Sequence, residues 1–121
     1  MNPADLFARE EIPVALATGD TLFREGDSAD CMFVVLEGSL QILVGDKVVE
    51  NSERGAIIGE MAVVDNSVRG ATVVAKTPCK LAKVDQRRFQ RLIQQNPFFA
   101  THVMKVLVDR IRSMNRLLTN G

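Results

Sequence analysis

The chain has 121 residues, of which 46% are hydrophobic and 25% charged, as is typical of a soluble globular protein with one domain. Its 15 Lys and Arg residues balance its 15 Asp and Glu residues, and a net charge of zero argues against non-specific binding of nucleic acids or membranes. The sequence contains no signal peptide and no apolar run of membrane-spanning length, so we expect a cytoplasmic protein.

The charges are unevenly distributed along the chain. Residues 1–85 contain 8 Lys and Arg against 14 Asp and Glu, whereas residues 86–121 contain 7 against 1. We interpret the basic C-terminal segment as the solvated face of helices that complement an acidic body, in preference to a DNA-binding arm. Cys31 and Cys79 lie in apolar, strand-like surroundings, which favours two buried free thiols over a disulfide.

The first two thirds of the chain predict a short helix followed by many strands. Within an N-terminal part of residues 1–12, residues 3–11 read as a short amphipathic helix. Residues 13–85 alternate short apolar runs with glycine-containing turns, which indicates a β-sandwich or a jelly roll. The continuous apolar run at residues 31–36 is expected of a core strand, and Gly45 is placed to form a tight hairpin turn.

The segment at residues 59–72 carries the strongest functional signal. Gly59 lets the backbone approach a ligand closely, and residues 60–64 predict one helical turn whose N-terminal N–H groups suit a phosphate. Arg69 supplies a charged fork for phosphate oxygens. The carboxylate of Glu60 would repel a phosphate and instead suits a pair of hydroxyls, such as a ribose edge. The segment therefore predicts a site for a small ligand with hydroxyls and an anion.

Residues 86–121 are predicted to be helical. Asp85 can cap a helix over residues 86–94, whose inward side chains are Phe89, Leu92 and Ile93. Asn96 and Pro97 then begin a second helix that runs to about residue 118.

The second helix carries apolar residues at heptad spacing. The residues of this heptad stripe are Met104, Leu107, Ile111, Met114 and Leu118. The heptad stripe could lie on the protein's own barrel as a lid, or it could pair with a second chain. It covers about two heptads, which is short for an autonomous coiled coil.

Residues 59–72 resemble the phosphate-binding cassette of the cyclic nucleotide-binding domain family, which includes ligand-binding domains of the catabolite activator protein type and of protein kinase A regulatory subunits. The matching residues are Gly59, Glu60, Met61, Ala62, Arg69, Ala71 and Thr72. The glycine-rich segments at residues 22–27, 32–38 and 54–55 also resemble the family framework, so that the resemblance spans roughly residues 12–118.

This resemblance implies a mainly β fold with flanking helices. The implied fold is a double-stranded β-helix, or jelly-roll barrel, with a short cassette helix and a C-terminal helical lid. The resemblance also implies a non-catalytic sensor that binds a cyclic nucleotide and needs no cofactor or metal. Binding would draw Arg69 inward, a hinge around Phe89 would follow, and the C-terminal helix would close over the base.

Two positions depart from the family pattern. Val68 replaces the proline that commonly precedes the arginine, which we expect to change the stiffness of the loop. Gly70 stands where the family carries Ala, Ser or Thr, and a hydroxyl at that position is associated with cGMP. Because Gly70 has no hydroxyl, the resemblance favours cAMP over cGMP, and the added flexibility is expected to lower affinity.

The resemblance implies further contacts around the base. The expected residues of the base pocket are Ile42, Val49, Ile58, Val73, Arg110, Met114 and Asn115. The four aliphatic residues would be buried in any such barrel. Met114 offers an apolar surface to a ring and Asn115 a hydrogen-bonding edge to adenine, although a core methionine and an exposed asparagine would look the same in sequence.

Other functions remain open at this point. The chain could be a jelly-roll interaction module that has lost ligand binding, or the ligand-binding part of a transcription regulator without its DNA-binding domain. A metal-dependent enzyme is disfavoured because such sites need several histidines and His102 is the only one. The expected partners are a cyclic nucleotide, a second copy through the C-terminal helix, and an unknown effector protein.

Overall fold

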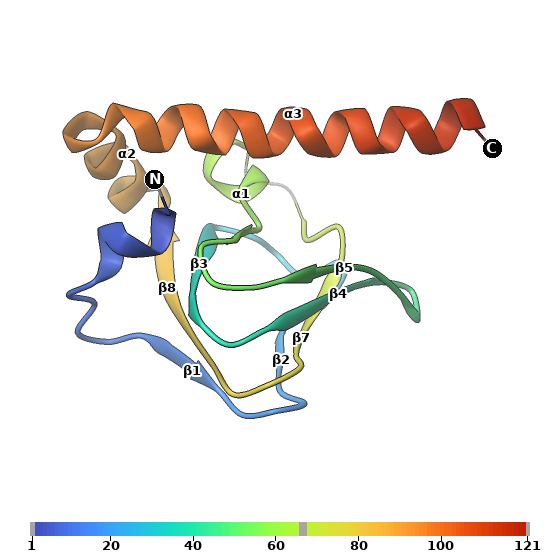
Figure 1. Cartoon of the computed structure of the whole chain (residues 1–121), viewed down its shortest axis with the longest axis horizontal. Coiled ribbons are helices and arrows are strands. Elements are labelled where there is room, and N and C mark those ends of the chain that lie inside the picture. The colour runs from blue at the N-terminus through green and yellow to red at the C-terminus, as the bar shows by residue number, and fades with distance from the viewer. Residues whose placement is uncertain (1, 66–67, 121) are drawn as a thin grey trace.

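The computed structural model describes residues 2–65 and 68–120, with side chains as far as residue 116. Two four-stranded antiparallel sheets form the body of the molecule, and helices cover one end of it (Figure 1). The strand orders are β1-β8-β3-β6 and β2-β7-β4-β5. The strands are β1 (Val14–Leu16), β2 (Thr21–Phe23), β3 (Cys31–Glu37), β4 (Leu40–Val44), β5 (Lys47–Ser52), β6 (Ile57–Ile58), β7 (Thr72–Ala75) and β8 (Cys79–Asp85). The helices are η1 (Pro3–Phe7), α1 (Met61–Val64), α2 (Gln86–Gln95) and α3 (Pro97–Asn120). The predicted mainly β jelly roll with flanking helices is confirmed.

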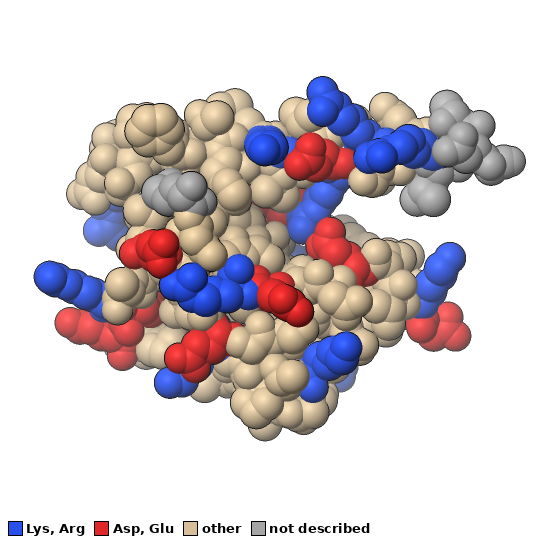
Figure 2. Space-filling model, viewed as in Figure 1, with Lys and Arg blue, Asp and Glu red and all other residues tan. Residues whose placement is uncertain are grey.

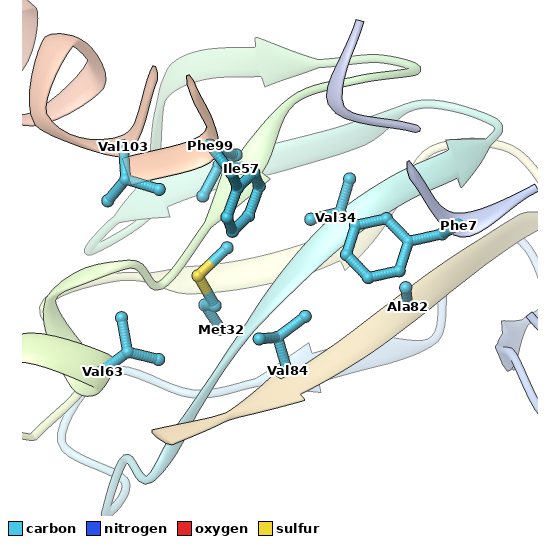
Figure 3. Packing of buried hydrophobic residues seen from close by; sticks show 9 residues of the cluster. All are labelled: Phe7, Met32, Val34, Ile57, Val63, Ala82, Val84, Phe99 and Val103. Atoms are coloured by element: carbon cyan, nitrogen blue, oxygen red, sulfur yellow. The ribbon is translucent and has the colours of Figure 1, made fainter. Parts of the chain in front are cut away.

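Strand β3 lies between β8 and β6 and is buried on both of its faces. Met32 and Val34 point into a cluster between the first sheet and the helices (Figure 3). Their neighbours Phe33 and Val35 point into a second cluster between the two sheets. A strand that is covered on both sides needs apolar residues at every position, which explains the unbroken apolar run in the sequence. The helix-side cluster comprises Phe7, Met32, Val34, Ile57, Val63, Ala82, Val84, Phe99 and Val103.

Strands β4 and β5 form the predicted hairpin. Val44 pairs with Lys47, so that Gly45 and Asp46 are the two residues of the turn. Gly45 has a φ of 64°, in the left-handed region that a tight hairpin turn requires and that glycine adopts without strain. The two cysteines are buried and unpaired, as predicted. Within the described residues, no helix combines the length and the apolar character needed to cross a membrane.

The N-terminal helix is shorter than the predicted 3–11. It is a 3₁₀ helix over Pro3–Phe7, begun by the Asn2 side chain, which accepts a hydrogen bond from the backbone of Ala4. Phe7 is buried in the helix-side cluster, whereas Ile12 is 87% exposed. The next turn lacks apolar contacts that would hold it, and Pro13 disfavours a helical conformation at residue 12, so the prediction was too long.

The two C-terminal helices begin where the sequence predicted. The Asp85 carboxylate accepts a hydrogen bond from the backbone N–H of Arg88 at 2.7 Å, which caps α2, and α3 begins at Pro97. The predicted inward residues of α2 pack against the helix-side cluster; they are Phe89, Leu92 and Ile93. Helix α3 lies across the end of the barrel, and its C-terminal half extends past the cassette (Figure 1).

The face of α3 that contacts the barrel differs from the predicted heptad stripe. Its buried residues are Phe99 and Val103, and Val106 and Leu107 pack beside them. Of the heptad stripe, only Leu107 is in this set; Met104, Ile111 and Met114 are 57%, 59% and 64% exposed. The side chain of Leu118 lies outside the described residues. Helix α3 therefore carries two sets of apolar residues at helical spacing. The set that contains Phe99 and Val103 packs on the barrel, and most of the heptad stripe does not.

Candidate functional site

The segment between β6 and β7 begins with a tight turn and a short helix. Gly59 has a φ of 72°, and a β-carbon built on it would lie 2.3 Å from Nη1 of Arg69. Glu60 is the N-cap residue of α1, which spans Met61–Val64. The predicted helical turn is thus present, and only glycine allows the arginine to lie directly beneath it.

Arg69 is held in place along its whole length. Its backbone N–H donates to the carbonyl of Asp27 and its own carbonyl accepts from Gly26, both at 2.8 Å. Its guanidinium donates to the carbonyl of Cys31 at 2.7 Å and to that of Gly59 at 3.4 Å. The Cζ atom lies 4.2 Å from the centre of the Phe23 ring. The arginine is therefore placed by the neighbouring turn, strand β3 and strand β2 together.

The charge of Arg69 is buried without an anionic partner. The residue is 7% exposed, no carboxylate forms an ion pair with it among the described residues, and its Nε has no hydrogen-bond partner there. Burial raises the pKa of the nearby Cys31 thiol above its ordinary value of 9.0, although the charge of Arg69 opposes this rise. Cys31 therefore stays a neutral thiol at physiological pH. A buried cation without a counterion is costly, which makes this position suited to an anion.

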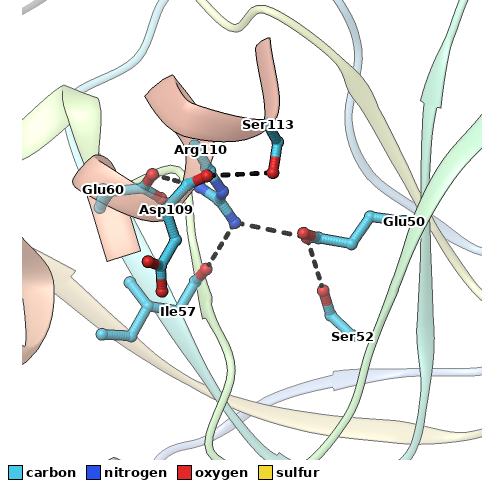
Figure 4. Close-up of polar contacts among 7 residues, drawn as sticks. All are labelled: Glu50, Ser52, Ile57, Glu60, Asp109, Arg110 and Ser113. Carbon is cyan, nitrogen blue, oxygen red and sulfur yellow. Dashed lines mark hydrogen bonds and ion pairs between the residues drawn. The ribbon is translucent and has the colours of Figure 1, made fainter. Parts of the chain in front are cut away.

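Glu60 is fully buried and faces the long helix. One of its oxygens, Oε1, forms an ion pair with Nη1 of Arg110 on α3 (Figure 4). Its other oxygen, Oε2, has no partner among the described residues. Arg110 also donates to the carbonyl of Ile57 at 3.2 Å and to Glu50 at 3.4 Å. This one guanidinium therefore connects α3 to β5, β6 and the start of the cassette.

A groove lies between α3 and the barrel beside this ion pair, and the molecular surface is hollowed between the two (Figure 2). Its volume is about 410 Å³. Residues 50–54 of β5 and the following turn form one wall, and the side chains of His102, Asp109 and Arg110 contribute to the other. Both charged and apolar groups line the groove, so it can accommodate a polar ring system.

The structure brings together only part of the predicted base pocket. Arg110 meets Glu60, as described above. Ile58 and Val73 are 1% exposed in the cluster between the sheets, and Ile42 packs against that cluster. Gly70 and Ala71 follow Arg69 in the loop that leads into β7. On α3, Met114 is 64% exposed and Asn115 is exposed, and neither belongs to the core clusters.

The expectation that Val49 is buried in the barrel was wrong, because this residue is 54% exposed. The register between β4 and β5 shifts at this point: Ile42 pairs with Glu50, whereas Leu43 pairs with Val48. Val49 is thus the extra residue of a β-bulge and has no partner opposite it. The same irregularity lies next to Glu50, whose carboxylate reaches Arg110.

Sequence reasoning missed three groups that contact the charged pair. They are the Phe23 ring, the carbonyl of Cys31 and the carboxylate of Glu50. A backbone carbonyl leaves no signal in a sequence. Phe23 did lie in the glycine-rich framework segment at residues 22–27, but nothing in the pattern linked its ring to an arginine more than forty positions later.

Comparisons with known proteins identify similar sequences and folds. Residues 13–96 match the model of the cyclic nucleotide-binding domain family. The chain is 28% identical over 106 residues to the cAMP-activated global transcriptional regulator CRP of Pasteurella multocida, covering 83% of this chain and 51% of that protein. It is 33% identical over 99 residues to the cAMP-dependent protein kinase regulatory subunit of Schizosaccharomyces pombe, covering 77% of this chain and 24% of that protein.

The fold also matches solved structures. The catabolite activator protein of Thermus thermophilus superposes with a TM-score of 0.80 at 22% identity, over 89% of this chain and 53% of that one. The chain thus spans about half the length, or less, of the relatives that it matches.

Proposed function

Because the chain belongs to the cyclic nucleotide-binding domain family, we propose that it is a cAMP sensor that responds to its ligand through the position of α3. The domain itself is a binding module. The observation that carries the proposal is Arg69, a buried cation with an unsatisfied Nε and no carboxylate partner among the described residues. The cyclic phosphate of the ligand supplies the missing negative charge.

The two charged residues take different parts of the ligand. Arg69 binds the phosphate oxygens, and the turn at Gly59 carries no side chain that would displace the guanidinium. The Oε2 atom of Glu60, which has no partner among the described residues, accepts a hydrogen bond from a ribose hydroxyl. The phosphate needs a cation and the ribose hydroxyl needs an acceptor, and Arg69 and Glu60 supply these two groups from one short segment.

The ion pair between Glu60 and Arg110 links the ligand to α3. A ribose hydroxyl and Arg110 compete for or share the same carboxylate, so binding changes how firmly α3 is held against the barrel. Such a change can drive closure of α3 only if the ligand binds the closed arrangement more tightly. The groove beside Arg110 then receives the base.

The choice of cAMP over cGMP rests on Gly70. It has no hydroxyl with which to bind the amino group of guanine, and the two curated relatives named above are described as responding to cAMP. Within a larger regulator of the CRP kind, this chain would be the ligand-binding part. A homodimer through α3 and an effector protein that reads α3 belong to this proposal.

Titration of the purified protein with cAMP and with cGMP in a calorimeter tests the proposal. We expect saturable binding of cAMP, weaker binding of cGMP, and a loss of about 2–5 kcal/mol of cAMP binding energy in Arg69→Ala. Arg87→Ala is the matched control, because Arg87 is exposed on α2 and does not line the groove. Absence of heat with either nucleotide at millimolar concentration would instead favour a jelly-roll interaction module that has lost ligand binding.

A further inference from the structure

The Phe23 ring is the closest aromatic contact of Arg69 and has no assigned role. We propose that Phe23 is a positioning residue for anion binding, whose ring holds the Arg69 guanidinium in its binding orientation while leaving its donors available. The inference rests on the proposed function and adds a residue outside the cassette to the binding site. The ring centre lies 4.2 Å from Cζ of Arg69, and a second ring, that of Phe33, lies 5.8 Å from it. Both distances are within the range of cation–π attraction.

An aromatic ring stabilises this arginine in a way that a carboxylate cannot. A carboxylate would neutralise the guanidinium and occupy the N–H groups that an anionic ligand needs. The face of a ring attracts the cation through its quadrupole and accepts none of the in-plane hydrogen bonds. This leaves the Nε of Arg69 without a partner among the described residues, although the residue is only 7% exposed. The ring thus compensates part of the cost of burying the charge and keeps the arginine competent to bind.

The strand pairing fixes Phe23 in this place. Strand β2 pairs with β7, which begins three residues after Arg69, and Phe23 lies opposite Val73. The pairing is irregular between Thr21 and Phe23, and the Phe23 ring is tilted against that of Phe33 at a centroid distance of 6.2 Å. The turn that follows β2 also binds both backbone groups of Arg69. The backbone and the guanidinium of Arg69 therefore both contact the same short stretch of chain, residues 23–27.

The test is to weaken the ring's quadrupole while keeping its shape. Phe23 is replaced in the full chain with mono-, di- and trifluorophenylalanine, and cAMP binding is measured by calorimetry. Each fluorine withdraws electron density from the ring face, so we expect the dissociation constant to rise stepwise, reaching about tenfold with three fluorines. A purely structural role would not follow the number of fluorines, and an unchanged dissociation constant in the trifluoro variant would overturn the proposal.

Phe7 provides the control position. It is 4% exposed and its ring centre lies 5.0 Å from Cζ of Arg88, outside the cassette, so trifluorophenylalanine there weakens a comparable contact and is expected to leave cAMP affinity unchanged. An equal loss of affinity at both positions would show that fluorination acts through general stability, and the inference would fall.

A measurement without ligand separates this inference from the proposed function. The side-chain N–H signals of Arg69 in an NMR spectrum of the free protein are expected to be shifted upfield by the ring, and the shift should disappear in Phe23→Leu. If it is absent from the parent, the stack itself is refuted. If the shift is present but the parent binds no cyclic nucleotide, the proposed function fails and the role of Phe23 in ligand binding falls with it.

Discussion

At the scale of single residues, Glu60 and Arg69 are both buried, but only Glu60 has a charged partner in the described structure. Arg69 relies on two backbone carbonyls and an aromatic ring, which stabilise its charge without cancelling it. The site therefore has a positive charge without a described counterion at Arg69, which suits an anion, and a carboxylate at Glu60 that is paired with Arg110 of α3. Small changes beside Arg69 should therefore affect binding strongly.

Two glycines on either side of Arg69 give a matched pair of predictions. Gly59→Ala introduces a β-carbon 2.3 Å from Nη1 of Arg69 at a φ of 72°, which should cost about 1–3 kcal/mol of stability and displace the guanidinium. At Gly70, where a β-carbon would meet nothing within 4 Å, alanine should add about 0.4–1 kcal/mol of stability through the unfolded state. Chemical denaturation measures both effects.

Calorimetric titration of the same two variants with cAMP checks the functional half of this prediction. We expect Gly59→Ala to lose most of its affinity and Gly70→Ala to retain it. A Gly59→Ala protein that folds and binds cAMP as tightly as the parent would mean that Arg69 does not contact the ligand beneath this turn.

The charged residues of the site could be found from sequence because their identity and spacing are diagnostic when taken together. Glu60 and Arg69 were predicted in this way, and the roles assigned to them stay predictions. The burial of Val49 was predicted from strand alternation and was wrong, because a β-bulge has no distinct signature in this sequence. Phe23 was overlooked because its contact with Arg69 depends on the pairing of strands distant in sequence.

At the scale of elements, α3 presents two apolar surfaces with different partners. Phe99 and Val103 are buried against the barrel. Met104, Val108, Ile111 and Met114 form an exposed apolar face on another side of the same helix. The sequence indicated that α3 would be amphipathic, but two overlapping sets of residues satisfied the helical period, and only packing against Met32 and its neighbours distinguishes them.

The exposed apolar face predicts self-association of the proposed kind. If α3 pairs with its counterpart in a second copy, Ile111→Glu should convert a dimer into a monomer in sedimentation velocity, because a carboxylate would be buried opposite itself across a two-fold axis. Arg112→Glu changes the charge at the adjacent exposed position and should leave the dimer intact. A parent that sediments as a monomer at high concentration would contradict a dimer through α3.

At the scale of the whole molecule, His102 links stability to pH. Burial lowers the pKa of His102 below its ordinary value of 6.5, and the positive charge of Lys105 contributes to the decrease. The unfolded chain therefore binds a proton more readily than the folded one, so stability is lost as the pH falls below about 6.5.

Denaturation of the parent and of His102→Gln at pH 7.5 and 5.5 measures this contribution. We expect the parent to lose more stability on acidification than the variant does. An identical loss in both proteins would exclude His102 as its source.

The overall architecture was predictable because turns and apolar runs indicated a β-sandwich or jelly roll, helix caps indicated the C-terminal helices, and the family resemblance specified the jelly roll. Asp85 and Pro97 mark the starts of α2 and α3 in the sequence as well as in the structure. The pairing of strands was less accessible, because β3 contacts β8 and β6 rather than its neighbours along the chain. Nothing local to residues 31–37 specifies these partners.

The double burial of β3 limits how this protein can vary. Phe33 and Val35 pack in the cluster between the sheets, and Met32 and Val34 pack in the helix-side cluster. The carbonyl of Cys31 accepts a hydrogen bond from Arg69. A substitution that shifts the backbone of this strand should therefore disturb two cores and the position of Arg69 together. Among natural variants, we expect this strand to tolerate the fewest replacements, with variation concentrated at exposed positions such as residues 47–49 of β5.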